Sequence, residues 1–269
     1  MGACILAIFT LLAIGAPLIA PCDPLALDLD DGLALPSWRH PLGTDLLGRD
    51  TLSRLLFGAR VSLTAASVVA LIVALIGLSV GTVAGFYGGW ADEIIMRLVD
   101  TLLAFPSFIL SLVVAGLLGP GLWNAILATT LVRWARTARV VRSIVLSLRD
   151  QEFVLAARSL GAGSGSIMIR HLVPNVLGPL IVLTTLDLGN VILSLAGLSF
   201  IGLGVQLPQP EWGAMLNYGR TYVQTAPLLT VFPGLAISLC VLSANLLGDG
   251  LRDFLDPRHQ RLPKETAAD

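Results

Sequence analysis

Long apolar runs separated by short polar segments make up most of this chain. Five of the runs carry at most one charged residue over the length that crosses a bilayer, and a sixth begins apolar and then acquires arginines. The runs are 3–20, 61–87, 101–118, 122–148, 176–201 and 228–247. The pattern therefore predicts an all-α, polytopic membrane protein with about six transmembrane helices.

The first run could instead belong to a signal peptide. Its start carries no Lys or Arg, which a signal peptide would show, and further apolar runs follow. A lipid-anchored Cys22 is also disfavoured because Pro21 precedes it. We expect residues 3–20 to form the first transmembrane helix.

Composition agrees with a membrane protein and excludes several other classes. Hydrophobic residues make up 55% and charged residues 13%, whereas about a quarter of an ordinary soluble domain is charged. The net charge of −1 gives no support for a nucleic-acid partner. The three cysteines lie far apart without a CxxC pair, so we expect packing roles and no disulfide framework. No cofactor is expected.

Glycines mark places where the predicted helices approach closely or turn. Gly77, Gly81 and Gly85 recur every four residues in the second run, which predicts a small-residue face for close helix packing. Residues 88–92 read as a turn, followed by a short interfacial helix over 92–100.

Four arginines follow one another at three-residue steps in the fourth run. Arg133, Arg136, Arg139 and Arg142 should share a slowly drifting helix face. We expect Arg139 and Arg142 to extend to the lipid headgroups at the cytoplasmic end. Arg133 and Arg136 could do the same, or could line the inner end of a water-filled path.

The fifth run carries Asp187 near its middle, with Asn190 close by. A carboxylate at the centre of a membrane helix costs at least ~2.5 kcal/mol. We therefore expect Asp187 to face a translocation path or to pair with Arg133. A neutral Asp187 hydrogen-bonded inside the bundle is the alternative. The pore candidates are Asp187, Asn190, Arg133 and Arg136.

The polar segment 21–60 contains the string His-Pro-Leu-Gly-Thr-Asp-Leu-Leu-Gly-Arg-Asp from His40 to Asp50. Its glycines suit tight turns, and Thr44 or Asp45 could cap the helix that follows. His40 and Asp45 could begin a metal site, but two ligands are too few and a structural turn is favoured. No metal site is predicted.

Residues 151–175 form an amphipathic, glycine-broken segment between membrane-length runs. Phe153, Leu155 or Ala156, and Leu160 recur at near-helical spacing. The glycines from Gly161 should end this helix, and a second short helix over 167–172 should end before Pro174. Such a segment cannot cross a bilayer. It either docks on a soluble partner or lies on lipid headgroups.

This segment resembles the cytoplasmic loop of inner-membrane permeases of ABC importers, which reads Glu-Ala-Ala, three residues, Gly, nine residues, Ile, any residue, Leu-Pro. The matching positions are Ala156, Ala157, Gly161 and Pro174. Leu155, His171 and Val173 depart from the pattern, and Glu152 or Arg158 could replace the missing glutamate. In that family the loop is a coupling helix that sits in a cleft of the ATPase. The resemblance therefore proposes Glu152, Leu155, Ala156, Ala157, Arg158, Gly161 and Pro174 as ATPase-coupling residues.

Four further stretches resemble the peptide/nickel branch of the same permeases. They are 40–50, 196–204, 211–213 and 248–257. The resemblance implies a subunit that pairs with a second homologous permease, two ATP-binding subunits and an extracytoplasmic binding protein. The chain lacks a GxxxxGK[ST] phosphate loop, so ATP hydrolysis is expected on another subunit and the chain is not itself an enzyme.

The distribution of basic residues predicts the orientation. With both termini inside, segments 88–100, 133–172 and 252–269 hold twelve of the 17 Lys and Arg residues, and segments 21–60 and 203–227 hold five. This excess places the coupling segment in the cytoplasm, and the family resemblance implies that the helices lie in the inner membrane of a bacterial cell. We divide the chain into a first helix with an extracytoplasmic segment (1–60), a permease core with five helices (61–257) and a short cytoplasmic tail (258–269).

Cargo is open between two solutes, and other classes of protein fit less well. Small peptides come first because the branch is broad, and nickel or a nickel chelate is the alternative, since Leu155 and the stretch 185–189 look more like nickel permeases. A cationic cargo would also suit Asp187. A secondary transporter would often show inverted repeats, which we do not find. A membrane enzyme would need clustered catalytic groups, and the three histidines lie in loops.

Overall fold

The computed structural model describes residues 1–255, and every regular element in that range is helical. The helices are α1 (Gly2–Ile19), α2 (Thr51–Tyr87), α3 (Gly89–Leu103), α4 (Ser107–Leu118), α5 (Leu122–Leu148), α6 (Glu152–Ser159), α7 (Ser164–Ile167), α8 (Val173–Phe200), α9 (Trp212–Gly219) and α10 (Leu228–Leu255). A π-helical turn (Met168–Leu172) joins α7 to α8, and short 3₁₀ turns cover Leu29–Asp31 and Arg220–Tyr222. The predicted tail 258–269 and the end of the motif at Pro257 lie outside the described residues.

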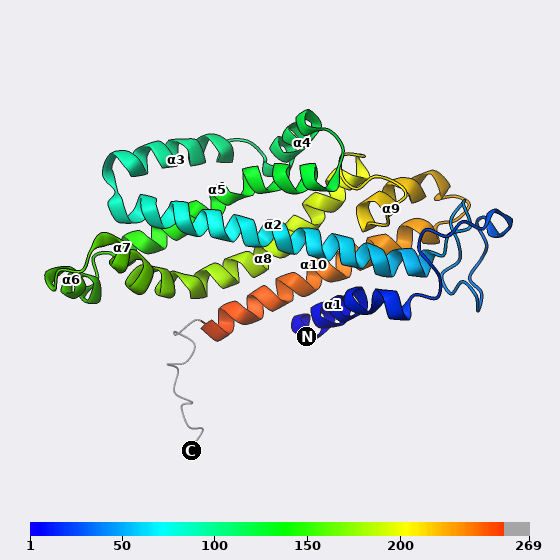
Figure 1. Ribbon diagram of the computed structural model, residues 1–269, viewed down its shortest axis with the longest axis horizontal. Coiled ribbons are helices and arrows are strands. Elements are labelled where there is room, and N and C mark those ends of the chain that lie inside the picture. Colours follow the sequence, from blue (N-terminus) through cyan, green and yellow to red (C-terminus); the bar gives the residue numbers. More distant parts are fainter. Residues whose placement is uncertain (256–269) are drawn as a thin grey trace, which may run out of the picture.

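The long helices form an elongated bundle. Figure 1 shows α2, α5, α8 and α10 running along its long axis, with α6 and α7 at one end and the segment between α1 and α2, together with α9, at the other. The start of α1 and the end of α10 both point toward the end that carries α6. The two polar regions of the sequence are therefore sorted to opposite ends of the bundle.

Four helices are long and apolar enough to cross a membrane: α1, α2, the continuous helix Ser164–Phe200 and α10. The pair α3 and α4 would add a fifth span if it counts as one bent crossing. α5 is 27 residues long but falls outside this set because of its arginines. The described chain is thus an all-α, multi-span membrane protein with four or five spans by apolarity.

The third predicted run, 101–118, is wrong as a single helix. α3 ends at Leu103, α4 begins at Ser107, and the two meet at 90°. Pro106 sits at the N-cap of α4, where the missing N–H of proline costs nothing, and it prevents α3 from continuing. α3 also begins at Gly89, inside the stretch predicted to be a turn.

The predicted second break before Pro174 is also wrong. Gly161, at φ +83°, ends α6 as expected, but Gly165 lies within α7 and the chain then runs without interruption into α8. Pro174 lies directly after the π-helical turn Met168–Leu172, so the helix continues across a residue that donates no N–H.

The glycine face of α2 is confirmed. A Cβ on Gly81 would lie 2.5 Å from the carbonyl oxygen of Ala138, and one on Gly77 would lie 2.5 Å from the Thr137 side chain. Gly85 meets Val145 in the same way. α2 and α5 therefore pack backbone to backbone, which only glycine at these positions allows.

α2 begins ten residues earlier than predicted. Asp50, and not Thr44 or Asp45, is its N-cap, and the Asp50 carboxylate accepts hydrogen bonds from the Ser53 N–H and hydroxyl, both at 2.7 Å. Asp45 instead accepts from the Leu47 and Arg49 N–H groups. The string 40–50 is thus a folded turn that ends in a helix cap.

Candidate functional site

A cavity of about 520 Å³ lies where the bend between α3 and α4 faces α5 and α8. It contains all four pore candidates from the sequence. Its lining consists of Leu103, Ser107, Phe108, Val132, Arg133, Arg136, Asp187, Asn190, Leu193, Ser194 and Gly197. A volume of this size suits a small organic solute.

Arg133 and Asp187 form an ion pair across this cavity. Arg133 Nε donates to Asp187 Oδ2 at 3.1 Å, and Nη2 donates to Oδ1. Arg133 Nη1 also reaches the hydroxyl of Ser194 at 3.4 Å. The two side chains are 12% and 17% exposed, so the pair is largely desolvated. The carboxylate at membrane depth thereby has its counter-ion, one turn of α8 away from Asn190.

Arg136 lines the same cavity one turn along α5 and is exposed to it. The structure gives it no ion-pair partner within residues 1–255. With Arg133 neutralised by Asp187, the charged groups of the lining sum to one positive charge.

The other two arginines of α5, Arg139 and Arg142, pair with carboxylates. Arg142 donates to both carboxylate oxygens of Asp92 at 2.5 Å, and Arg139 pairs with Asp100. Both carboxylates lie on α3. Arg142 thus has a carboxylate partner, and Arg139, still 46% exposed, shares its charge with α3; contact of both with lipid headgroups stays a prediction. These pairs fasten α3 along α5 and so position the bend that closes the cavity.

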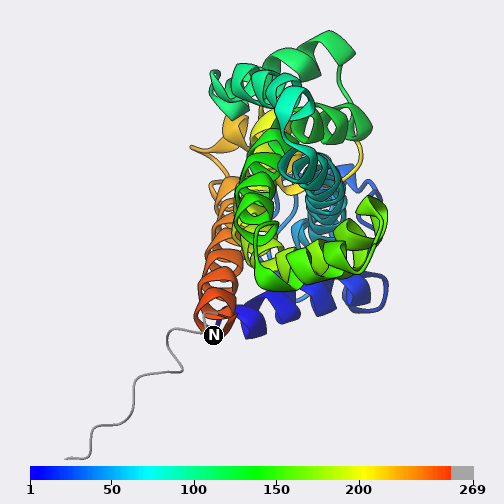
Figure 2. The ribbon, with the colours of Figure 1, turned by 90° about the vertical axis from the view of Figure 1, so that its left-hand side faces the viewer.

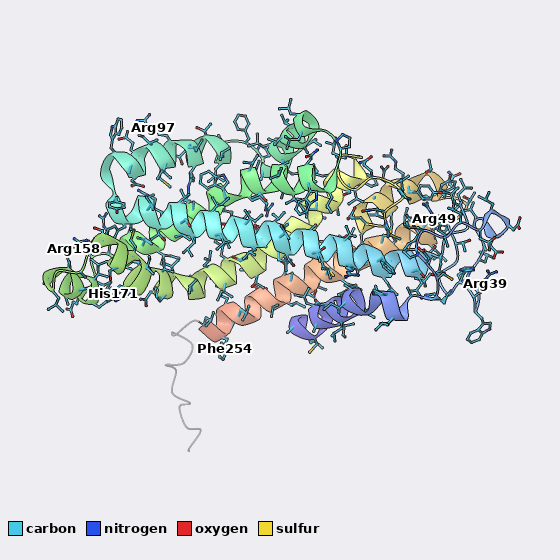
Figure 3. The ribbon with its side chains drawn as sticks, in the orientation of Figure 1. Arg39, Arg49, Arg97, Arg158, His171 and Phe254 are labelled. Carbon is cyan, nitrogen blue, oxygen red and sulfur yellow. The ribbon has the colours of Figure 1, made fainter. Side chains whose placement is uncertain are left out.

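At the far end of the bundle, α6 lies across the ends of the long helices (Figure 2). Its inward contact is Val154, which is fully buried among Phe86, Val141, Val145 and Leu172. The Arg158 guanidinium lies 5.9 Å from the centre of the Phe86 ring, and both Arg158 and His171 sit at this end in Figure 3. α6 is therefore anchored to the bundle by one side of the helix.

The apolar side chains of α6 that the sequence predicts to lie on one face point away from the bundle. Phe153, Leu155 and Leu160 are 42%, 46% and 88% exposed. Of the proposed coupling residues, Ala157 is half-buried and the others are exposed: Glu152, Leu155, Ala156, Arg158, Gly161 and Pro174. An exposed apolar surface next to charged side chains suits either a protein partner or the lipid headgroup region.

The opposite end of the bundle carries a second polar cluster. His40 Nδ1 lies 2.9 Å from Asp50 Oδ1, and the Arg49 Nε donates to Asp45 Oδ2 at 2.7 Å. Arg49 is labelled at this end in Figure 3, and its guanidinium also lies over the ring of Tyr218. His40 and Asp45 thus have separate partners and do not converge. Residues 1–255 contain no group of three His, Cys, Asp or Glu side chains placed to hold a metal ion.

Comparison with known proteins fits this arrangement of a polar-lined cavity in a membrane bundle. The family described as "Binding-protein-dependent transport system inner membrane component" matches residues 77–261. The chain belongs to this family. It is 47% identical to the nickel transport system permease protein NikC of Escherichia coli over 94% of this chain and 91% of NikC. It is 43% identical to the dipeptide transport system permease protein DppC of Alkalihalophilus pseudofirmus over 96% of this chain and 85% of DppC.

A third relative is the glutathione transport system permease protein GsiD of Pectobacterium atrosepticum, 46% identical over 83% of this chain and 74% of GsiD. The permease is therefore a member of the peptide/nickel branch of ABC importers, as the motifs at 40–50 and 211–213 predicted. It is a multi-pass transport subunit and not itself an enzyme.

Sequence reasoning missed the part that Glu211 plays in the permease. Glu211 is 3% exposed and caps α9, accepting from the Gly213 and Ala214 N–H groups at 2.9 Å and from the Ser62 hydroxyl at 3.0 Å. Burial raises the pKa of Glu211, and the hydrogen bonds oppose that shift. Glutamate is not among the residues preferred at an N-cap, so the residues around Glu211 carried no clear signal for this role.

Proposed function

We propose that this chain is the membrane-spanning permease subunit of an ATP-driven importer that moves small peptides across the bacterial inner membrane. The cavity lined by Arg133, Arg136, Asp187 and Asn190 supports this most directly. Polar and charged groups at membrane depth are expensive unless they line a path or pair with one another. In this cavity Arg133 and Asp187 pair with each other, and Arg136 and Asn190 line the space.

We further propose that the permease crosses the membrane six times with both termini in the cytoplasm. α5 is about 40 Å long, enough to cross the hydrocarbon core. Its arginines are compatible with a crossing because Arg133 and Arg142 have carboxylate partners on α8 and α3. The excess of basic residues in the segments around α6 assigns that end to the cytoplasm.

The surface of α6 is the proposed contact for the ATP-binding subunits. Exposed Phe153, Leu155 and Leu160 offer apolar contact, and Glu152 and Arg158 flank them with opposite charges. Because Val154 anchors α6 to the ends of α2, α5 and α8, motion of a bound ATPase would move these helices. A second, homologous permease and a binding protein at the opposite end would complete the importer, with lipid around the bundle.

Among cargoes, small peptides come first and nickel or a nickel chelate second. The relatives include permeases named for nickel, dipeptide and glutathione transport at similar identity, so likeness alone does not rank these solutes. The cavity volume is ample for a dipeptide. The pairing of Asp187 with Arg133 removes the earlier argument that Asp187 favours a cation.

The test is uptake into proteoliposomes that contain this chain, its partner permease, both ATPases and the cognate binding protein. Labelled dipeptide and labelled nickel are offered in parallel, with and without ATP. ATP-dependent dipeptide uptake is expected. An ATPase whose phosphate-loop lysine is replaced should abolish it. Uptake that continues without ATP would overturn the importer proposal in favour of a secondary carrier.

A further inference from the structure

We infer that Arg136 is a transient binding subsite for the carboxylate group of the cargo. This inference rests on the proposed transport function and names the chemical class that the cavity selects. The observation behind it is an imbalance of charge: three charged side chains line the cavity, and only two of them neutralise each other.

The ion pair of Arg133 and Asp187 carries no net charge. Two donor nitrogens of the guanidinium meet two carboxylate oxygens, which is the strong two-point geometry for these groups. A third nitrogen of Arg133 reaches Ser194. Asp187 therefore offers little attraction to a passing cation, and Arg133 offers little to a passing anion.

Arg136 lies one helical turn from Arg133 on the same wall, and within the described part of the chain it has no carboxylate partner. Asn190 and Ser107 add uncharged polar groups nearby on the lining. A guanidinium with these neighbours is complementary to a carboxylate, which accepts two parallel N–H groups.

The cavity lining lacks suitable ligands for a bare metal ion. Its eleven residues include one carboxylate, already paired, and no histidine or cysteine. Imidazole is a favoured nickel ligand, and a net positive wall repels a divalent cation. Leu103, Phe108, Val132 and Leu193 supply apolar wall instead, which suits an organic solute that carries an acid group.

The first experiment measures the charge preference of the cavity without relying on the binding protein to select the cargo. Ser107→Cys is introduced in the assembled transporter, with Cys4 and Cys22 replaced by Ser and the buried Cys240 kept. The introduced thiol is labelled with an anionic or a cationic methanethiosulfonate, and labelling is read by mass spectrometry of the peptide that carries residue 107. The anionic reagent should react faster by roughly tenfold, because one unpaired cation changes local ion concentrations by about that factor.

Arg136→Glu should reverse that ratio, and Arg136→Gln should bring it near one. Arg97→Gln is the matched control, since Arg97 is an exposed arginine of α3 that pairs with Glu93 outside the cavity, and it should leave the ratio unchanged. A millimolar dipeptide with a free C-terminal carboxylate should protect the thiol at least about fivefold better than the same dipeptide amidated.

The second experiment measures transport in the complete system. Arg136→Gln should lower ATP-dependent dipeptide uptake at least about fivefold, and Arg136→Lys should restore only part of it, since the charge is kept but the two parallel N–H groups are not. Equal labelling of Ser107→Cys by the two reagents, together with normal dipeptide uptake by Arg136→Gln, would overturn the subsite and leave the transport function standing. Faster labelling by the cationic reagent would overturn it as well. Absence of ATP-dependent uptake by the wild-type system would instead contradict the proposed function.

Discussion

At the scale of single residues, the chemistry of this permease depends on which charges have partners. Asp187 and Arg133 neutralise each other, Arg142 is held by Asp92, and Arg136 stays free within the described chain. Arginines placed three residues apart in sequence thus have three different environments. Their roles follow from what α3 and α8 place opposite them and not from their spacing on α5.

We expect Asp187→Asn to impair transport because it leaves Arg133 as a second unpaired cation in the cavity. The loss of a charged hydrogen-bonded partner should also lower the free energy of unfolding by about 1.5–3 kcal/mol. The double variant Arg133→Gln, Asp187→Asn removes both charges and should restore stability. Uptake and thermal unfolding are measured for both variants. A double variant with wild-type uptake would show that the pair is structural and has no part in translocation.

Glu211 provides a prediction about pH. Its raised pKa means that the folded state binds a proton more tightly than the unfolded chain, whose pKa is near the ordinary 4.5. This contribution to stability is therefore complete below about pH 4.5 and is lost as pH rises through the folded-state pKa. Wild type should lose thermal stability relative to Glu211→Gln as pH is raised, because glutamine does not titrate.

Glu211→Ala should cost about 0.5–2 kcal/mol for the cap of α9 alone. Thermal unfolding in detergent across a pH series checks both statements. Wild type that instead gains thermal stability relative to Glu211→Gln as pH is raised would mean that folding lowers the pKa of Glu211, against this prediction.

At the scale of the elements, two contacts define how the bundle works. α2 and α5 touch through glycines and form one closely packed unit. α6 is attached to this unit by Val154 on one side and leaves Leu155 and Leu160 bare on the other. We therefore expect motion of α6 to be passed to α5, which lines the cavity.

Gly81→Ala should destabilise the permease because its Cβ would lie 2.5 Å from the Ala138 oxygen on α5. Overpacking of this kind costs about 1–3 kcal/mol. Gly116→Ala in α4 is the control, since a Cβ there meets nothing within 4 Å. Thermal unfolding of the two variants should differ, and equal melting temperatures would argue against close contact of α2 and α5.

Leu160→Ser should reduce ATP-driven uptake several-fold without lowering thermal stability, because this side chain is 88% exposed and its loss removes apolar contact with a partner only. Leu35→Ser is the matched control at the opposite end of the bundle, with 81% exposure. Uptake per ATP hydrolysed is the measurement. Equal uptake by both variants would remove Leu160 from the proposed contact.

At the scale of the whole molecule, the sequence predicted the class and most of the long helices, because apolar runs and the glycine spacing are local properties. It placed Arg133, Arg136, Asp187 and Asn190 as pore candidates, and they line one cavity. Pro106 marks the place where α3 and α4 separate, but the sequence could not foresee the 90° angle between them or the pairing of Asp92 and Asp100 with arginines on α5. The inward side of α6 was also missed, since Val154 is one apolar residue among several and only packing distinguishes it.

The proposed orientation can be tested with Ser159→Cys on α6 and Ala26→Cys at the opposite end, both at exposed positions. Cys4 and Cys22 are replaced by Ser for this purpose. A membrane-impermeant maleimide should label only the second thiol in intact spheroplasts and only the first in inside-out vesicles. The reverse pattern would invert the bundle and remove the cytoplasmic assignment of α6.

The charged helix α5 also constrains how the chain enters the membrane during synthesis. α5 is too rich in arginine to partition into lipid alone, and its partners are made at different times. Asp92 and Asp100 precede it, whereas Asp187 follows 54 residues after Arg133. We therefore expect α3, α4 and α5 to stay together in the water-filled translocon until α8 arrives and Asp187 pairs with Arg133. A ribosome-stalled chain ending before Asp187 should leave α5 accessible to water-soluble labels.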